Sequence, residues 1–201
     1  MHPSWAPIGA ARFEELVDAD FFNGCRFFRV ISGFMAQFGI SGKPAVNAEW
    51  REKPIKDDPV TQSNQPYTVS FATSGENSRT TQLFINFVDN DRLDTMGFAP
   101  FAKIISGFDT VDEIYAEHGE TPNQGYIQEQ GNTSATAASE TTARARHRSR
   151  QAQDATLSRI STRSRVRYLK KKFPKLSYIT ATKKKGTMKG YVHKPPVEEE
   201  L

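Results

Sequence analysis

Arg29 and Gln37 are the two residues of this chain best suited to chemistry, because both interrupt an otherwise apolar run. Residues 25–40 read C-R-F-F-R-V-I-S-G-F-M-A-Q-F-G-I. An arginine keeps its charge at any ordinary pH and is seldom buried without a partner or a task. Its guanidinium always donates hydrogen bonds, so it could stabilise a lone pair that develops on a substrate above an apolar floor. A structural pair that braces a strand is the alternative for these two residues.

Thiol and metal chemistry are disfavoured by the sparse cysteine and histidine content. Cys25 is the single cysteine, so no intrachain disulfide can form, and it is expected to be a buried, inert thiol among aromatic residues. The four histidines are scattered, and none stands three or four residues from another. We therefore expect neither a metal nor a cofactor.

Hydrophobic patterning predicts short strands and two separated helices. The expected elements are a helix over 7–17, strands within 27–38 and over 68–73, 82–88 and 98–105, and a helix from about 108 to 115. Thr110 and Glu113 have the spacing of a capping box at the start of that last helix. Residues 41–66 hold four prolines and are expected to form a long surface excursion. This pattern favours a closed or nearly closed sheet flanked by helices.

Charge and composition divide the 201-residue chain into an acidic body and a basic end. Residues 1–132 carry a net charge of −8, and residues 133–201 carry +12. We expect residues 133–167, which are rich in Ala, Ser, Thr and Arg, to be a disordered insertion. Residues 168–180 are expected to add a C-terminal strand, and 181–201 to form a basic disordered tail. No secretory signal or membrane segment is recognisable, so a cytoplasmic location is the default expectation.

Three segments together resemble the cyclophilin-type peptidyl-prolyl cis-trans isomerases. They are F-F-R-V-I-S-G-F-M-A-Q-F-G, S-F-A-T-S-G-E-N-S-R-T-T-Q-L-F-I-N and D-R-L-D-T-M-G-F-A-P-F-A-K-I-I-S-G-F-D-T-V-D. The resemblance runs from about Ala6 to Tyr115, and the combination is specific although each segment alone is weak. It implies a mainly β fold, a closed eight-stranded antiparallel barrel with two flanking helices and a proline-binding groove on its outer face.

The resemblance also implies a role for each motif residue. Arg29 would be the catalytic hydrogen-bond donor, and Gln37 would either orient its guanidinium or hold the substrate backbone. Residues implied in substrate binding are Phe34 and Met35 lining the slot, Ala72 and Thr73 beside the residues before proline, Gln82 and Phe84 on the adjoining strand, and Leu93 closing the pocket. Taken singly, the apolar members of this set would be interpreted as core residues, and the joint spacing of the three segments favours the groove instead.

Several positions depart from the family pattern. Phe28 stands where the family commonly has histidine, and Arg92 stands in place of a loop tryptophan that contacts cyclosporin. A second groove histidine would fall near Met96 or Gly97, and Thr73 replaces an asparagine. We expect weak cyclosporin binding, because a mobile arginine lacks the flat face and the N–H of an indole. Isomerase activity is still expected, because the donor Arg29 and the pocket floor at Phe84 are present.

Two larger departures concern the chain as a whole. The first helix is not preceded by the family's two N-terminal strands, so the domain is expected to be incomplete there, with unpaired edges. About 35 residues also separate P-N-Q-G-Y-I-Q-E-Q-G-N from Y-L-K-K-K-F-P-K-L-S-Y-I. Both features indicate a gene-model artefact, with a natural insertion as the alternative.

The expected function is isomerisation of X–Pro bonds, which would assist protein folding. Its partners would be proline-containing peptides or unfolded client proteins, and the protein is expected to be a monomer. The alternative is a catalytically weak cyclophilin-like module that holds a proline-containing partner. Nucleic-acid binding by the Arg/Ser-rich stretch is disfavoured, because that stretch lacks aromatic residues for base stacking.

Overall fold

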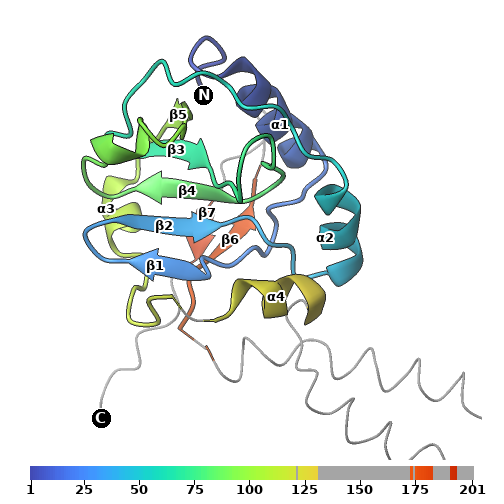
Figure 1. Ribbon diagram of the computed structural model, residues 1–201. Helices are drawn as coiled ribbons and strands as arrows, with labels where there is room; N and C mark the ends of the chain where they lie inside the picture. The colour runs from blue at the N-terminus through green and yellow to red at the C-terminus, as the bar shows by residue number, and fades with distance from the viewer. Residues whose placement is uncertain (121, 131–172, 174, 183–190, 194–201) are drawn as a thin grey trace, which may run out of the picture.

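An antiparallel sheet of five strands forms the centre of the molecule. The computed structural model describes residues 1–120, 122–130, 173, 175–182 and 191–193. The five strands are β1 (Arg29–Ile31), β2 (Met35–Phe38), β3 (Thr68–Phe71), β4 (Leu83–Asn86) and β5 (Pro100–Lys103). Their order across the sheet is β1-β2-β4-β3-β5 (Figure 1). A second, two-stranded antiparallel sheet pairs β6 (Tyr178–Ala181) with β7 (Tyr191–His193).

In the described part of the chain, four α-helices and one 3-10 helix lie around the sheet. They are α1 (Pro7–Asp18), α2 (Pro44–Arg51), the 3-10 helix η1 (Asp91–Leu93), α3 (Phe108–Asp112) and α4 (Gln124–Gln130). Figure 1 shows α2 and α4 beside one another at one end of the strands, and α3 at the other end. Within the described part of the chain, no helix has the length and apolar character needed to cross a bilayer.

The helix α1 begins where the sequence predicts, and a distant carboxylate caps it. Pro7 occupies the first turn, where its missing N–H costs nothing. Asp58 accepts hydrogen bonds from the backbone N–H groups of Ile8 (3.0 Å) and Gly9 (2.7 Å). A negative charge at this end also complements the helix dipole. The cap ties the segment before β3 to α1.

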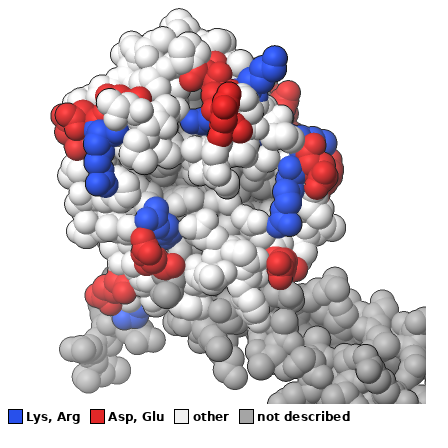
Figure 2. Space-filling model, viewed as in Figure 1, with Lys and Arg blue, Asp and Glu red and all other residues white. Residues whose placement is uncertain are grey.

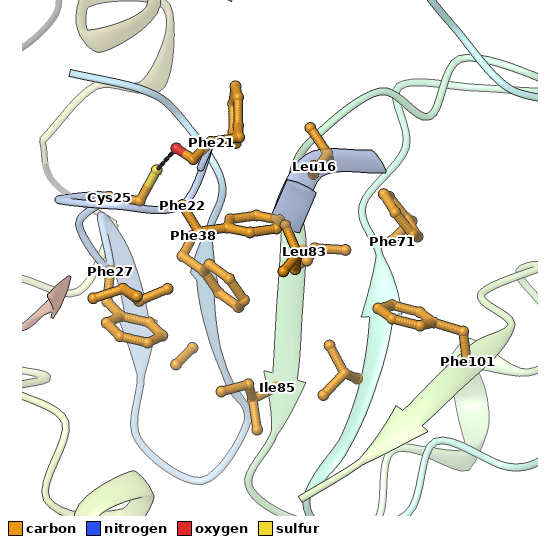
Figure 3. Close-up of a cluster of buried hydrophobic side chains, with 14 of the residues drawn as sticks. Leu16, Phe21, Phe22, Cys25, Phe27, Phe38, Phe71, Leu83, Ile85 and Phe101 are labelled. Carbon is orange, nitrogen blue, oxygen red and sulfur yellow. Dashed lines mark hydrogen bonds between the residues drawn. The ribbon is translucent and has the colours of Figure 1, made fainter. Parts of the chain in front are cut away.

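The main core lies between α1 and one face of the sheet (Figure 3). Strand residues that alternate along the sequence share this face, as strand geometry requires. The labelled members in Figure 3 are Leu16, Phe21, Phe22, Cys25, Phe27, Phe38, Phe71, Leu83, Ile85 and Phe101. Phe22 packs at 5.7 Å between ring centroids from Phe38 and at 5.5 Å from Phe13. Each such buried side chain contributes about 1.5–3 kcal/mol to folding.

A glycine is required where β2 ends. Gly39 has φ +100°, a conformation that other residues rarely adopt. A side-chain carbon at this position would overlap the backbone carbonyl of Thr81. Thr81 also donates its hydroxyl to the Gly39 carbonyl at 2.9 Å, which holds β2 close to the start of β4.

Three expectations for the helices are wrong. The proline-rich range 41–66 contains α2, since Pro44 begins that helix rather than preventing it. Thr110 does not cap α3, because Gly107 is the N-cap residue and Thr110 lies inside the helix. The helix α4 was not expected, so two helices was too low a number.

The described strands form a mainly β, antiparallel fold, and no pair among them closes the five-stranded sheet into a barrel. Strands β1 and β5 are the two ends of the five-stranded sheet and are not paired with each other. The chain before β1 instead contacts β6: the N–H of Phe27 donates to the carbonyl of Ser177 at 3.0 Å, and the N–H of Ile179 donates to the carbonyl of Cys25 at 2.9 Å.

The described residues include only part of the C-terminal region for which expectations were stated. The expected insertion over 133–167 lies outside the described residues, and with it the Arg/Ser-rich stretch. Within 168–180, the strand that was expected begins at Tyr178. The range 181–201, expected to be a tail without structure, contains β7.

Candidate active site

Three neighbouring strands place Arg29, Gln37 and Phe84 side by side. Arg29 of β1 pairs with Gln37 of β2, and Gln37 pairs with Phe84 of β4. Directly opposite residues in antiparallel strands point to the same face of the sheet. The alternating residues Val30 and Ala36 point to the other face and belong to the main core. The candidate site therefore lies on the sheet face that is turned away from the main core.

A second apolar cluster, separate from the main core, covers this face beside Gln37; we call it the slot cluster. Its buried members are Met35, Phe84 and Leu93, and Ile31, Phe34, Ala72 and Phe98 pack against them. The rings of Phe84 and Phe98 meet edge to face, with centroids 5.5 Å apart and planes at 77°. The apolar residues that the sequence predicted for the proline slot are therefore brought together, although they come from β2, β4, η1 and the positions just before β2 and just after β3.

The guanidinium of Arg29 contacts both a glutamine and a carboxylate. Its Nη1 lies 3.4 Å from Oε1 of Gln37, and Nε2 of Gln37 donates to Oε1 of Gln82 at 2.8 Å. Its Nη2 and Nε donate to Oε1 of Glu120 at 2.7 and 3.3 Å. The side chain of Arg29 is 26% exposed, and that of Glu120 is 70% exposed. Arg29 is thus held at the edge of the slot cluster with part of its donor set in contact with solvent.

Thr73 and Phe28, which both replace family residues, contribute no polar group to the slot cluster. The hydroxyl of Thr73 faces its own turn, where it lies 2.9 Å from Oγ of Ser78 and accepts the N–H of Gly75 at 3.0 Å. Phe28 is buried in a different cluster with Ile40 and Ile127. The replacement of histidine by Phe28 therefore does not alter the wall of the slot cluster.

Buried asparagines hold the backbone of the slot walls. Asn90, which is 5% exposed, donates from Nδ2 to the carbonyl of Phe34 at 3.0 Å. Asn64 is fully buried and donates from Nδ2 to the carbonyl of Phe98 at 2.8 Å. Buried amide groups need such partners, because an unpaired one is costly. These two bonds fix the backbone at Phe34 and Phe98, whose rings pack against the slot cluster.

Asp94 belongs to the same polar support. It accepts hydrogen bonds at Oδ1 from the backbone N–H of Asn64 at 2.9 Å and from Nδ2 of Asn64 at 2.7 Å. Burial acts to raise the pKa of Asp94, but hydrogen bonds from Ser63 and Asn64 outweigh it, so the pKa lies below its ordinary value. Asp94 is therefore a charged structural acceptor.

Two residues at the site were not predicted from the sequence. Phe98, which packs against the slot cluster, was not among the residues named from the three motifs. Glu120 carries no local signal, since it is 91 residues from Arg29. It is brought near because the N–H of Val30 donates to the Gly119 carbonyl at 3.1 Å.

Arg92 contributes to the rim of the site. Its guanidinium carbon lies 4.8 Å above the ring of Phe34, a cation–π distance. In Figure 2, which has the same viewpoint as Figure 1, much of the surface is uncharged, and several of the charged side chains stand next to side chains of opposite sign. The arrangement suits a ligand that combines an apolar ring with hydrogen-bond acceptors.

Comparison with known proteins identifies the family. The family model described as cyclophilin type peptidyl-prolyl cis-trans isomerase/CLD matches residues 1–147. A peptidyl-prolyl cis-trans isomerase of Acinetobacter baylyi is 38% identical over 136 residues, which are 59% of this chain and 70% of the relative. Peptidyl-prolyl cis-trans isomerase B of Escherichia coli is 35% identical over 118 residues, covering 54% of this chain and 71% of the relative.

A solved structure agrees in fold. The cyclophilin AquaCyp293 from Hirschia baltica superposes with a TM-score of 0.50 at 18% identity, covering 61% of this chain and 64% of that chain. Together with the family model over residues 1–147 of the 201, these findings show that the chain belongs to the cyclophilin-type peptidyl-prolyl cis-trans isomerase family.

Proposed function

We propose that this protein isomerises X–Pro peptide bonds at the slot cluster, with Arg29 as the catalytic donor. Rotation about a peptide bond breaks amide resonance and has a barrier near 20 kcal/mol. At the twisted transition state, the prolyl nitrogen regains its lone pair and can accept a hydrogen bond. A donor that meets this nitrogen binds the twisted form better than either planar isomer, and this difference lowers the barrier.

The observation that carries the proposal is the position of Arg29 in register with Gln37 and Phe84 at the edge of the slot cluster. In this proposal the proline ring rests on Met35 and Phe84. Gln37 accepts from the guanidinium and orients it. The reaction moves no proton and forms no covalent bond to the protein, so it requires no nucleophile, metal or cofactor.

The remaining predicted residues complete the proposed groove. Ala72 and Thr73 would bind the residues before proline through their main chain at the end of β3. Gln82 would support Gln37, to which it is bonded. Phe34 and Leu93 would close the slot around the ring. The proposed partners are proline-containing peptides and flexible client chains.

We also propose that residues 1–132 form the isomerase domain and that a strand in 168–180 completes it. Contacts of Ser177 and Ile179 with the chain before β1 support the second part. Barrel closure, which the family resemblance implies, stays a proposal.

One observation favours the second candidate function, a binding module with weak turnover. Glu120 occupies Nη2 and Nε of Arg29, the atoms that a substrate nitrogen would otherwise approach. An exposed ion pair of this kind is weak, however, at about 0.2–1 kcal/mol. We therefore favour the enzyme.

The test is catalysed cis/trans exchange of a proline-containing peptide, measured by NMR for the wild type, Arg29→Ala and Arg51→Ala. Arg51 is an exposed arginine of α2 bonded to Gln128, so it is a matched control. We expect exchange with the wild type and Arg51→Ala, and a loss of about 100-fold with Arg29→Ala. Peptide binding by the wild type without accelerated exchange would favour the binding module.

A further inference from the structure

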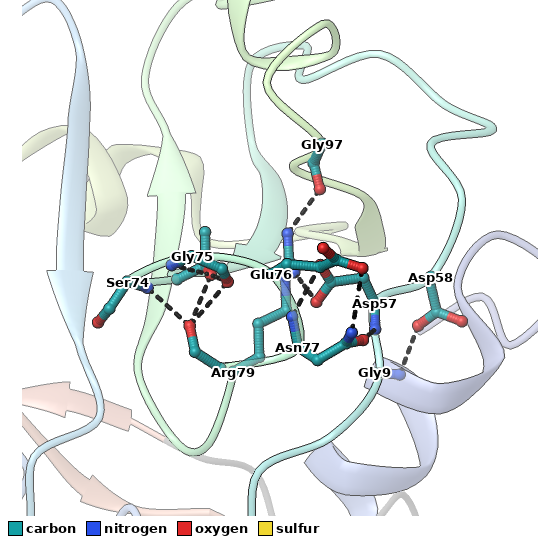
Figure 4. Close-up of polar contacts among 11 residues, drawn as sticks. Gly9, Asp57, Asp58, Ser74, Gly75, Glu76, Asn77, Arg79 and Gly97 are labelled. Atoms are coloured by element: carbon teal, nitrogen blue, oxygen red, sulfur yellow. Dashed lines mark hydrogen bonds and ion pairs between the residues drawn. The ribbon is translucent and has the colours of Figure 1, made fainter.

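Arg79 is a buried arginine that joins three separate segments of the chain. It is 6% exposed. Its Nη1 pairs with Asp57, and its Nη2 donates to the carbonyl of Gly97 at 2.6 Å. Its own carbonyl accepts the N–H of Ile55 at 2.9 Å. Figure 4 shows the side chain reaching from the 74–79 turn to Asp57 and to the segment that carries Gly97.

These contacts bear on the slot cluster through Phe98. The carbonyl that Arg79 holds belongs to the peptide unit just before Phe98, and the guanidinium carbon lies 6.0 Å from the Phe98 ring centroid. Phe98 in turn packs edge to face on Phe84, the floor of the cluster. The position of this wall therefore depends on where Arg79 holds the preceding peptide.

The arginine is itself firmly held. Asp57 is 30% exposed, and it is fixed by two hydrogen bonds with Asn77, one accepted from the backbone N–H of Asn77 at 3.1 Å and one donated to its Oδ1 at 3.0 Å. A buried charge that loses its partner strongly destabilises the fold, so the folded protein keeps Arg79 and Asp57 together. Arginine reaches these two acceptors with a rigid, planar fork, whereas the three donors of a lysine ammonium share one atom at the end of a flexible stem.

We propose that Arg79 determines substrate specificity as a positioning residue: it holds Phe98 so that the slot accepts the five-membered ring of proline and rejects a six-membered ring. Arg79 touches no substrate and acts through Gly97 and Phe98. This inference rests on the proposed function, because it requires the slot cluster to bind the ring. A pocket that is fixed in size rejects one extra methylene by about 10–200-fold.

The experiment compares exchange of two matched peptides, one with proline and one with its six-membered homologue pipecolic acid. Each is assayed with the wild type, Arg79→Met, Arg79→Lys and Arg12→Met. Arg12 is the control, because it is 8% exposed and donates to the carbonyls of Lys53 at 2.6 Å and Thr80 at 3.3 Å, and neither acceptor belongs to the slot cluster. Loss of either arginine should lower stability, but only Arg79 should alter ring selectivity.

The wild type should prefer proline over the six-membered ring by at least about tenfold in kcat/KM. Arg79→Met should reduce this ratio at least about fivefold, Arg79→Lys should give an intermediate ratio, and Arg12→Met should stay within about twofold of the wild type. If Arg79→Met does not fold, Asp57→Asn replaces it, with Asp58→Asn as its control, since Asp58 caps α1 instead.

An unchanged ratio in a folded Arg79 or Asp57 variant would overturn the inference while leaving the proposed function intact. An equal fall in the ratio with Arg12→Met would also overturn it, because the effect would then follow from lost stability alone. A wild type that accelerates exchange of neither peptide would instead overturn the proposed function, and the inference with it.

Discussion

Glu120 is expected to restrain the catalytic arginine, and its removal should raise activity slightly. Oε1 of Glu120 accepts from Nη2 and Nε of Arg29, so substitution by glutamine removes the charge but keeps an acceptor of the same size. The side chains of the pair are 70% and 26% exposed, so water and salt screen the interaction. Its contribution is at most about 1 kcal/mol, which corresponds to about fivefold in rate.

We therefore expect Glu120→Gln to increase kcat/KM for a proline peptide by about two- to fivefold at low ionic strength. The gain should shrink as salt is raised toward about 0.5 M, because screening frees Arg29 in the wild type as well. Exchange NMR at several salt concentrations measures both effects. Glu117→Gln is the matched control: Glu117 accepts the hydroxyl of Tyr115 at 2.7 Å and has no bond to Arg29.

A tenfold or larger loss of activity in Glu120→Gln would refute this reasoning, because it would mean that the carboxylate orients the donor productively. An equal gain in Glu117→Gln would also refute it, since the effect would then come from net charge and not from contact with Arg29.

Three further predictions concern other residues. Burial raises the pKa of the Cys25 thiol to about 12, so the native protein should resist alkylation at pH 8 and react only in denaturant; rapid native labelling would contradict this. The pKa of Asp94 is depressed in the folded state, so its stabilising effect is complete above about pH 4 and is lost as the pH falls through the folded pKa. Asp94→Asn should therefore flatten the acid side of the stability curve, and an unchanged slope in chemical denaturation would argue against that role. Because Arg92 stands at the rim, cyclosporin should bind with a Kd in the micromolar range or weaker, and nanomolar affinity in calorimetry would be the opposite result.

The local parts of the fold could be predicted from the sequence. The apolar, β-rich runs at 27–38 and 82–88 indicated strands, and the strands that form put Gln37 and Phe84 on one face. The α2 helix was missed because prolines in 41–66 were taken as breakers, whereas Pro44 suits a first helical turn. The order of the five strands could not be predicted from pattern alone, since it depends on pairing between segments far apart in the chain.

In the candidate site, too, only the residues that lie in local motifs could be predicted from the sequence. Motif resemblance was enough to propose Arg29, Met35 and Leu93, because their spacing is local to three short segments. The contacts of Glu120 and Arg79 could not be predicted, since each joins residues that only the tertiary fold brings together. When a positioning residue and its partner lie in different segments, the distance between them in the sequence gives no sign of their contact.

The most direct test of the central claim separates binding from rotation. Proline peptide is titrated into the wild type and Arg29→Ala to obtain Kd, and the cis/trans rate in the bound state is measured by exchange NMR. If Arg29 acts on the transition state, Arg29→Ala should bind within about threefold of the wild type while the bound-state rate falls about 100-fold. A variant that binds much more weakly but rotates the bound peptide at the wild-type rate would contradict the account.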